Sequence, residues 1–351
     1  EERVKLARQG IRMPTLWIDT LKDERRPIEK VEALKTRVFN NGPFDFTIVF
    51  RQYFVGFIAH LMENRITNEV SIGTNVYSRD WEKTYRKVQE KGEKIIAGDF
   101  SSFDGSLNAC MMSKFVDLAN EFYSDGNDLI RQVLFQEVYN SIHRCDNIIY
   151  NMTHSQPSGN PATTPLNCFI NSLGIRLTWK IICKKNSVKL NFKDHVSIVS
   201  YGDDNLINFS DYVAPFFNMD SISKAFKELG YTYTDETKSG GDTPKWRKIG
   251  DVAYLKRNFR IDETFGVIEA PLSLDTIMEM PNWIRNGMDK LEATKINCET
   301  AIMELSMHDR EVFNKYSTMI RKAYYDETGN PLDTKSYDQY HDERLEEYYL
   351  M

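Results

Sequence analysis

The chain has 351 residues, of which 41% are hydrophobic and 12% aromatic. This length and composition indicate a globular protein with two or three subdomains and a large core. The net charge of −6 disfavours a surface coated by nucleic acid, but it allows a binder whose basic residues line one channel.

Two further functional classes are disfavoured by the sequence. No uncharged apolar run approaches the roughly 20 residues of a membrane span. The five cysteines are an odd number without CxxC pairs, which indicates reduced core thiols in a cytoplasmic protein rather than a zinc site or a disulfide framework. The chain begins Glu-Glu-Arg without an initiator Met, so we expect it to be a piece of a longer protein.

Residues 16–42 are dense in charge, and their basic residues recur at steps of four and five. This basic series consists of Lys22, Arg26, Lys30, Lys35 and Arg37, with Arg37 on a predicted strand over residues 36–39. Such a series can line one wall of a channel for a phosphate chain. The alternative is a solvated surface segment whose neighbouring acids cancel the charge. Residues 46–64 then predict a largely buried helix.

Residues 94–100 predict a strand with Asp99 at its carboxyl end. Asp104 follows five residues later, where an N-cap belongs, because apolar residues at helical spacing come after it. The simplest interpretations are a turn residue for Asp99 and a cap for Asp104. Loops at the carboxyl ends of strands also gather functional ligands, so both acids are candidate site residues.

A turn-rich loop, Gln-Pro-Ser-Gly-Asn-Pro at residues 156–161, precedes a long predicted helix. Thr163 and Asn167 are four residues apart and share the helix face opposite the apolar stripe. The alternative is an ordinary helix start followed by a packing helix.

The most informative stretch is a predicted hairpin over residues 196–210, whose tip is Tyr201-Gly202-Asp203-Asp204. Two adjacent carboxylates at the tip of an apolar hairpin are costly without a positive partner, and a divalent cation would supply one. The alternative is a pair of turn residues selected for local hydrogen bonds. If Asp99 and Asp203 face each other from neighbouring antiparallel strands, with Asp204 beside them, they can hold two Mg²⁺ ions roughly 3.5–4 Å apart.

Beyond the hairpin, strands are predicted over residues 231–234 and 252–259, with Lys238 on the loop between them. A second hairpin is predicted through residues 262–266. The remaining chain is predicted to be helical, and it ends in an acidic, tyrosine-rich tail over residues 337–351.

The ordered motifs resemble those of the picornavirus-like RNA-dependent RNA polymerases. Those similar to motifs A to E are Asp99-x4-Asp104, Ser158-Gly159-x3-Thr163-x3-Asn167, Tyr201-Gly202-Asp203-Asp204, Lys238 and Leu255-Lys256-Arg257. The basic series resembles motif F, and the wording Gly-Asp-Phe-Ser-Ser-Phe-Asp-Gly at 98–105 resembles the insect dicistrovirus branch. A lone Gly-Asp-Asp would be a weak signal, whereas six motifs in order are a specific one.

The resemblance implies an α+β fold, the right-hand polymerase with fingers, an antiparallel-sheet palm and a helical thumb. The fingers are expected over residues 1–60, incomplete at the amino end because the family's segment bridging fingers to thumb should precede residue 1. The palm is expected over residues 61–262 with a fingers insertion near 136–157, and the thumb over residues 263–351.

The resemblance also implies a role for each candidate residue. The implied metal ligands are Asp99, Asp203 and Asp204, which also carry catalysis together with Lys238 as the acid toward pyrophosphate. The implied contacts to the ribose 2′-hydroxyl are Asp104, Ser158, Thr163 and Asn167. The implied triphosphate contacts are Arg37 and the other members of the basic series, Lys22, Arg26, Lys30 and Lys35. The implied primer and RNA contacts are Gly159, Lys256 and Arg257.

The implied function is RNA-templated synthesis of RNA from ribonucleoside triphosphates by two-metal nucleotidyl transfer, which replicates the genome of a positive-strand RNA virus. The implied cofactor is Mg²⁺ as two ions, with Mn²⁺ as a substitute. The expected partners are template and nascent RNA, ribonucleoside triphosphates, a protein primer and other viral replication proteins. The expected location is the host cytoplasm, in membrane-associated replication complexes.

Two other functions are compatible with parts of this pattern. A reverse transcriptase also carries paired Asp after an aromatic residue in its hairpin, but Gly202 and the Asp104/Asn167 pair suit a site that demands a 2′-hydroxyl. A non-catalytic RNA-binding subunit on the same fold is disfavoured because both Asp99 and Asp203 are present.

Overall fold

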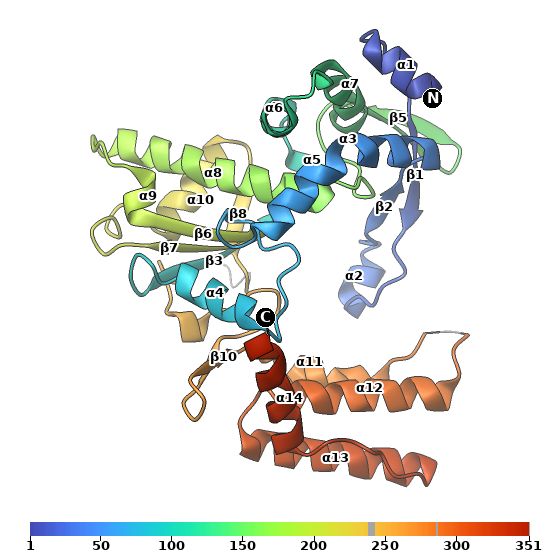
Figure 1. Ribbon diagram of the computed structural model, residues 1–351, viewed down its shortest axis with the longest axis vertical. Helices are drawn as coiled ribbons and strands as arrows, with labels where there is room; N and C mark the ends of the chain where they lie inside the picture. Colours follow the sequence, from blue (N-terminus) through green and yellow to red (C-terminus); the bar gives the residue numbers. More distant parts are fainter. Residues whose placement is uncertain (238–242, 286, 351) are drawn as a thin grey trace.

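A four-stranded antiparallel sheet lies at the centre of the molecule in the computed structural model, which describes residues 1–237, 243–285 and 287–350 (Figure 1). The strand order is β6-β7-β3-β8. These strands are β3 (Lys94–Ser101), β6 (Val196–Tyr201), β7 (Asp204–Phe209) and β8 (Thr232–Asp235). The first five residues of β6 are all buried, as expected for an apolar run covered on both faces.

Helices cover both faces of this central sheet (Figure 1). On one face lie α8 (Thr163–Lys185) and α10 (Met219–Glu228), and on the other lies α4 (Arg79–Lys87). The short helix α9 (Phe192–His195) leads directly into β6. The predicted hairpin over residues 196–210 is therefore confirmed, and it supplies two neighbouring strands, β6 and β7, of the central sheet.

A second four-stranded sheet, in the order β2-β1-β4-β5, joins segments that are far apart in the sequence. Its strands are β1 (Leu16–Leu21), β2 (Val38–Asn41), β4 (Ser141–Cys145) and β5 (Ile148–Met152). The β1–β4 pair is parallel, and Trp17 of β1 donates a hydrogen bond of 3.2 Å to the carbonyl of Glu137. This pairing places β4 and β5 in the same unit as the amino-terminal strands.

An aromatic core supports the second sheet. The rings of Phe50 and Phe54 stack at 4.3 Å within α3, and Phe135 packs against both. The helices here are α1 (Glu2–Arg8), α2 (Ile28–Glu32), α3 (Phe44–Glu63), α5 (Phe103–Ser106), α6 (Ala109–Tyr123) and α7 (Asp128–Tyr139). The helix predicted over residues 46–64 is confirmed as α3, but it buries one aromatic face and is not largely buried as predicted.

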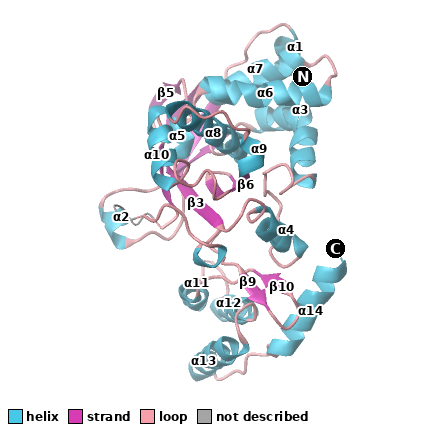
Figure 2. Cartoon of the chain, turned by 90° about the vertical axis from the view of Figure 1, so that its left-hand side faces the viewer, coloured by secondary structure: helices cyan, strands magenta, loops and turns pink. Residues whose placement is uncertain are grey.

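The carboxyl-terminal part consists of a small hairpin and a set of helices, seen end-on in Figure 2. Its elements are the 3-10 turn η1 (Ile249–Asp251), β9 (Arg260–Asp262), β10 (Val267–Glu269), α11 (Leu274–Glu279), η2 (Met280–Asn282), α12 (Lys290–Leu305), α13 (Arg310–Thr328) and α14 (Tyr337–Leu350). The hairpin predicted through residues 262–266 is confirmed. The tyrosine-rich tail forms helix α14.

Arg257, Arg25 and Tyr348 each help to join the carboxyl-terminal helices to the rest of the chain. Arg257 makes a buried ion pair with Glu304 of α12 at 2.9 Å. Arg25, on the loop between β1 and α2, pairs with Glu279 of α11 at 2.6 Å. Tyr348 of α14 donates a hydrogen bond to Glu82 of α4.

Several local predictions were wrong. Residues 252–259 form no strand in the described chain; Tyr254 and Arg257 instead close a tight turn in which Leu255 and Lys256 have φ of +53° and +63°. Strand β2 begins at Val38, one residue beyond Arg37. The five cysteines are unpaired thiols as expected, although Cys110 and Cys145 are exposed and not in the core.

Candidate active site

The end of β3 and the start of β7 meet at one cavity. Gly98 of β3 pairs with Asn205 of β7, and Asp99 and Asp204 each lie one residue beyond that pair. Asp99 itself pairs with Thr234 of β8. Asp99 and Asp204 both line a cavity of about 320 Å³ that is shared with Lys256. The structure therefore brings Asp99 from the strand end to the same cavity as Asp204 from the hairpin, whereas Asp203, which was expected to face Asp99, is not among the described residues that line it.

Asp203 lies in the turn between β6 and β7. Tyr201 and Asp204 close this hairpin, so that its two central residues are Gly202 and Asp203. Gly202 has φ of +65°, and a positive φ at the first central position alone is typical of a type II′ turn. The positive φ of Gly202 therefore explains why the predicted turn has a glycine at this position.

Gly98 is required by a close approach across the sheet. A Cβ atom at this position would lie 1.7 Å from Tyr233 Oη, which donates a hydrogen bond of 2.7 Å to Asn205 Oδ1. Burial raises the pKa of Tyr233 far above its ordinary value, so this hydroxyl remains a donor. Tyr233 thereby bridges β8 to β7 across the face of Gly98.

A polar cluster joins α5 to the first turns of α8. Asn167 Nδ2 donates to Asp104 Oδ1 at 2.9 Å, so the predicted Asp104/Asn167 pair is present. Gln156 donates to Asp104 Oδ1 at 3.2 Å and also to Asn167 Oδ1. The sequence analysis missed Gln156, whose only signal was its place at the start of the turn-rich loop. Asp104 is not the N-cap of the helix predicted directly after it: it lies inside α5, and Asn108 caps α6.

Ser158, Gly159 and the Thr163 hydroxyl have partners outside that cluster, although the Thr163 carbonyl accepts a hydrogen bond from Gln156 Nε2 at 3.4 Å. Ser158 exchanges hydrogen bonds with Asn40 of β2, whose backbone N–H donates to Ser158 Oγ at 3.2 Å. A Cβ on Gly159 would lie 2.1 Å from the Asn40 carbonyl oxygen, so only glycine fits there. Thr163 Oγ1 donates to the Asn160 carbonyl at 2.8 Å, which stabilises the loop before α8.

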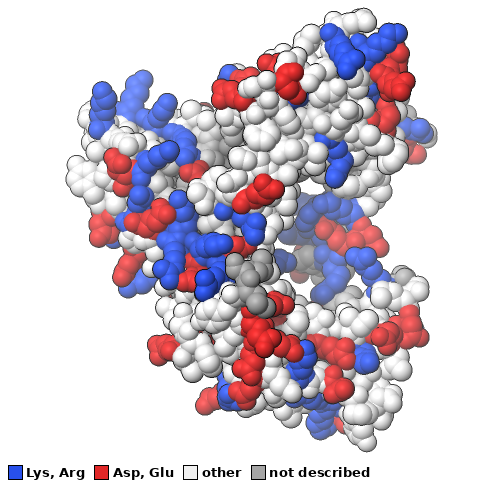
Figure 3. All heavy atoms as spheres, viewed as in Figure 1, with Lys and Arg blue, Asp and Glu red and all other residues white. Residues whose placement is uncertain are grey.

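The basic series surrounds α2 in the hollow between the upper part of the molecule and the carboxyl-terminal helices (Figure 3). Arg37 lies 3.4 Å from Glu24, and Arg26 lies 3.7 Å from the same carboxylate oxygen. Lys30 and Lys35 are exposed. Glu24 thus contacts both arginines of the basic series, so a neighbouring acid cancels part of the charge of the series.

The two expected primer contacts differ in orientation. Lys256 lines the cavity with Asp99 and Asp204. Arg257 donates from both Nη atoms to Glu304 at 2.9 Å and also to the Ala270 carbonyl at 2.8 Å. Its side chain is only 12% exposed. The expected RNA contact of Arg257 is therefore corrected to a buried ion pair between the turn and α12.

Lys238 lies outside the described residues, so its expected role in catalysis stays a prediction. The strand before it is anchored by Asp235, whose carboxylate accepts hydrogen bonds from the Thr237 backbone N–H at 2.9 Å and from Thr243 Oγ1 at 2.9 Å.

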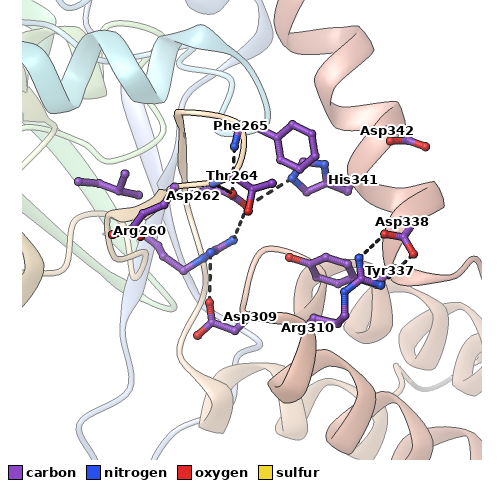
Figure 4. Close-up of a pocket in the computed structure, with 12 residues that line it drawn as sticks. Arg260, Asp262, Thr264, Phe265, Asp309, Arg310, Tyr337, Asp338, His341 and Asp342 are labelled. Atoms are coloured by element: carbon purple, nitrogen blue, oxygen red, sulfur yellow. Dashed lines mark hydrogen bonds and ion pairs between the residues drawn. The ribbon is translucent and has the colours of Figure 1, made fainter.

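Another acidic cluster lies far from this cavity, between the β9–β10 hairpin and α14 (Figure 4). Asp262, Glu269 and His341 offer atoms within 4.8 Å of one another, as a metal site would. However, Arg260 lies 3.5 Å from Asp262, and Arg344 lies 3.1 Å from Glu269. Two guanidinium groups already balance the two carboxylates, so we assign this cluster to docking α14 onto the hairpin.

In the part of the chain that the structure describes, no helix is long and apolar enough to span a membrane.

Residues 1–324 match a family model described as viral RNA-dependent RNA polymerase. The chain therefore belongs to the viral RNA-dependent RNA polymerase family. The replicase polyprotein of acute bee paralysis virus (strain Rothamsted) is 63% identical over 359 residues, which cover 99% of this chain and 19% of the polyprotein. The replicase polyprotein of cricket paralysis virus is 41% identical over 332 residues, or 90% of this chain and 19% of the polyprotein. The chain thus spans about a fifth of the length of these relatives, and the predicted resemblance to the dicistrovirus branch is confirmed.

A solved structure supports the fold. The Sicinivirus 3Dpol RNA dependent RNA polymerase superposes with a TM-score of 0.82 at 20% identity, covering 99% of this chain and 70% of that chain. The predicted α+β fold, the right-hand polymerase with its antiparallel central sheet and helical end, is confirmed.

Proposed function

We propose that this chain catalyses RNA-templated synthesis of RNA from ribonucleoside triphosphates by two-metal nucleotidyl transfer. The observation that carries the proposal is that Asp99 and Asp204 line one cavity where β3 leaves its pairing with β7. Two-metal nucleotidyl transfer needs carboxylates that converge on one point, because together they must hold two metal ions close to the reacting phosphate.

The cavity suits a pair of Mg²⁺ ions, with Mn²⁺ as a substitute. Among the described residues that line it, the acids are Asp99, Asp204 and Glu236, and Glu236 is already paired with Arg247. Mg²⁺ prefers oxygen ligands and needs few from the protein, because phosphate and water complete its octahedron. Asp99, Asp203 and Asp204 would hold the ions, which when bound would activate the attacking hydroxyl and offset charge on the leaving pyrophosphate.

The chain's own polar groups would select and hold the nucleotide. Asp104, Asn167 and Gln156 form a hydrogen-bonded cluster that an incoming 2′-hydroxyl can join, whereas a deoxyribose leaves it incomplete. We assign Ser158 and Thr163 to the loop that supports this cluster, since each already has a backbone or side-chain partner.

Positive charge near the triphosphate would come from the fingers side and from the turn after β8. Arg37 and Arg26 are gathered by Glu24, and phosphate oxygens would compete with that carboxylate for the same guanidinium groups. Lys22, Lys30 and Lys35 would add longer-range attraction. We retain Lys238 as the acid toward pyrophosphate, and Lys256 with Gly159 beside the primer and RNA.

We further propose fingers over residues 1–60, a palm over 61–262 with a fingers insertion near 136–157, and a thumb over 263–351. The joining of β4 and β5 to β1 and β2 supports the insertion. Because the similar proteins are replicase polyproteins of RNA viruses, we propose that the chain replicates a positive-strand RNA genome in the host cytoplasm. Membrane-associated complexes, a protein primer and other viral replication proteins belong to the same proposal.

Extension of a labelled primer on an RNA template tests the proposal. The 351-residue chain is supplied with ribonucleotides or deoxyribonucleotides in Mg²⁺, with and without a chelator. We expect template-dependent extension with ribonucleotides that stops when the chelator is added. Extension preferring deoxyribonucleotides would instead indicate a reverse transcriptase, and RNA binding without extension would indicate a non-catalytic subunit.

A further inference from the structure

Helix α8 holds the tip of the β6–β7 hairpin through a buried side chain that the polymerase motifs do not include. Asn171 lies one helical turn beyond Asn167 and is 0% exposed. Its Nδ2 donates to the Gly202 carbonyl at 3.2 Å and to the Asp203 carbonyl at 3.0 Å. We propose that Asn171 is a positioning residue for the carboxylates of Asp203 and Asp204, an inference that rests on the proposed function.

The two carbonyls that Asn171 binds belong to the central residues of the turn. In the hairpin the ladder pair is Tyr201 with Asp204, so the peptide groups of Gly202 and Asp203 lie outside the ladder. Buried carbonyls outside a ladder need a donor from elsewhere. A single amide group that reaches both carbonyls fixes the direction of two consecutive peptide planes, and with them the Cα–Cβ bond of Asp203.

Cys168, three residues earlier on α8, also binds this turn through hydrogen bonds on its amino-terminal side. The Gly202 backbone N–H donates to Cys168 Sγ at 3.0 Å, and the thiol donates to the Ser200 carbonyl at 3.4 Å. Burial raises the pKa of Cys168 to about 12, so the group stays a neutral thiol that can both donate and accept. Gly202 is therefore bound to α8 through both its N–H and its carbonyl.

The hydrogen bonds that Asn171 Nδ2 donates explain why this buried position has an amide side chain. Asn171 Oδ1 is buried and has no hydrogen-bond partner among the described residues. An unpaired buried oxygen is unfavourable, so an apolar side chain would fill the same space better if packing were the only role. The amide is explained by the two carbonyls that its nitrogen serves.

The placement of Asn171 also links two parts of the site. Asn167 and Asn171 are four residues apart and lie on the same side of α8. The first contacts Asp104 in the ribose cluster, and the second holds the turn that carries Asp203. One rigid helix thus fixes the sugar-binding cluster relative to the metal-binding carboxylates.

Metal binding by variants at Asn171 tests the proposal. We would replace Asn171 with Leu, which keeps the branching at Cγ but is larger and lacks the polar atoms, and with Ala, which leaves room for the turn to relax. The matched control is Thr178→Val, a buried position two turns further along α8 whose hydroxyl bonds only to the Ile175 carbonyl of its own helix. Mn²⁺ binding to the chain alone is measured by titration with electron paramagnetic resonance, alongside thermal unfolding, nucleotide KM and the Mg²⁺ concentration for half-maximal extension.

We expect Mn²⁺ binding to weaken by about 10- to 100-fold in both Asn171 variants, the range typical for the loss of a group that orients metal ligands. The Mg²⁺ requirement should rise in parallel, with a smaller change in nucleotide KM, while Thr178→Val keeps the metal affinity of the unmodified chain. A folded Asn171→Ala or Asn171→Leu protein with unchanged Mn²⁺ affinity would overturn the proposal, and so would an equal loss in Thr178→Val. If neither Asn171 variant folds, Cys168→Ala decides: unchanged Mn²⁺ affinity there counts against α8 as the support of the turn, and a loss counts for it. The Mn²⁺ titration needs no catalysis, so failure of the unmodified chain to extend a primer would count against the proposed function and not against this inference.

Discussion

The two halves of the candidate site differ in how firmly the fold holds them. The carboxylates stand at the ends of β3 and β7, in a sheet whose neighbouring residues Ile96 and Ile207 are buried. The basic series instead lies around α2, a helix without a single buried residue, and Arg37 is 55% exposed. Metal ligands must meet strict distance and angle requirements, whereas cations attract phosphate over several ångströms and long side chains can adjust. The fold is therefore most rigid around the carboxylates, where metal binding requires a precise geometry.

The largest effect is expected at the carboxylates. Asp203→Asn removes charge with almost no change in volume, so folding should be intact while nucleotide addition falls by roughly 10³-fold or more, the equivalent of several kcal/mol of lost charge stabilisation. Single-turnover primer extension in Mg²⁺ measures the loss. The control is Asp211→Asn at the exposed far end of β7, which should extend normally. Near-normal turnover of Asp203→Asn would remove the two-metal assignment.

A strong effect on stability is expected at Gly98, where the rigid half has no spare room. The Cβ of Gly98→Ala would overlap Tyr233 Oη and separate β3 from β8. Overpacking of this kind typically costs about 1–3 kcal/mol, and the shift should also reach the neighbouring Asp99. Urea unfolding of Gly98→Ala is compared with Gly250→Ala, a position with nothing within 4 Å of the added carbon. Equal stability of the two variants would show that the central sheet tolerates a Cβ at residue 98 and is less rigid than we infer.

Substitution of Asn167 tests the polar cluster of Asp104, Gln156 and Asn167, which is distinct from both the carboxylates and the basic series. A buried site that hydrogen-bonds a hydroxyl penalises the analogue that lacks it by leaving polar groups unpaired, at about 1–3 kcal/mol. Asn167→Ala should therefore slow ribonucleotide addition and reduce the preference over deoxyribonucleotide by about tenfold or more. The ratio of kcat/KM for ATP and dATP is the measurement. A variant that loses stability with an unaltered ratio would leave Asn167 as a packing residue of α8.

The smallest effects are expected in the basic series. Arg37→Ala should raise the KM for nucleotide by roughly 3- to 10-fold, below the usual value for a charged hydrogen bond because the side chain is exposed. Lys30→Ala and Lys35→Ala should change KM less, and all three effects should shrink as salt is raised. Nucleotide titrations at two salt concentrations separate these cases. If all three variants match the unmodified chain, the series is a solvated surface.

The sequence predicted those parts of the site that follow from local patterns. The hairpin over residues 196–210 and the strand before Asp99 were predictable because β-branched runs ending in Gly or Asp constrain both backbone and register. The Asp104/Asn167 contact was predictable only through the family resemblance, because it joins elements 63 residues apart.

The remainder depended on tertiary contacts that leave little trace in a local pattern. Residues 252–259 have the composition of a strand, yet the chain turns back at Leu255 and Lys256, neither of which favours positive φ. The ion pair of Arg257 could not be predicted from a local pattern, because its partner Glu304 is 47 residues away. Asn40 gave no signal, and Gln156 gave only its place at the start of the turn-rich loop, because each acts on a loop or helix that the sequence alone does not bring near.

Two of the ion pairs that join the carboxyl-terminal helices to the rest of the chain differ strongly in burial. The side chains of the Arg257–Glu304 pair are 12% and 4% exposed, while those of the Arg25–Glu279 pair are 53% and 52% exposed, with Arg25 also 3.9 Å from the centre of the Trp283 ring. Dissolved salt screens an exposed pair strongly and a buried one weakly. We therefore expect rising ionic strength to weaken the contact between Arg25 and α11 more than the contact between Arg257 and α12, so that salt acts first on the side of the molecule that carries the basic series.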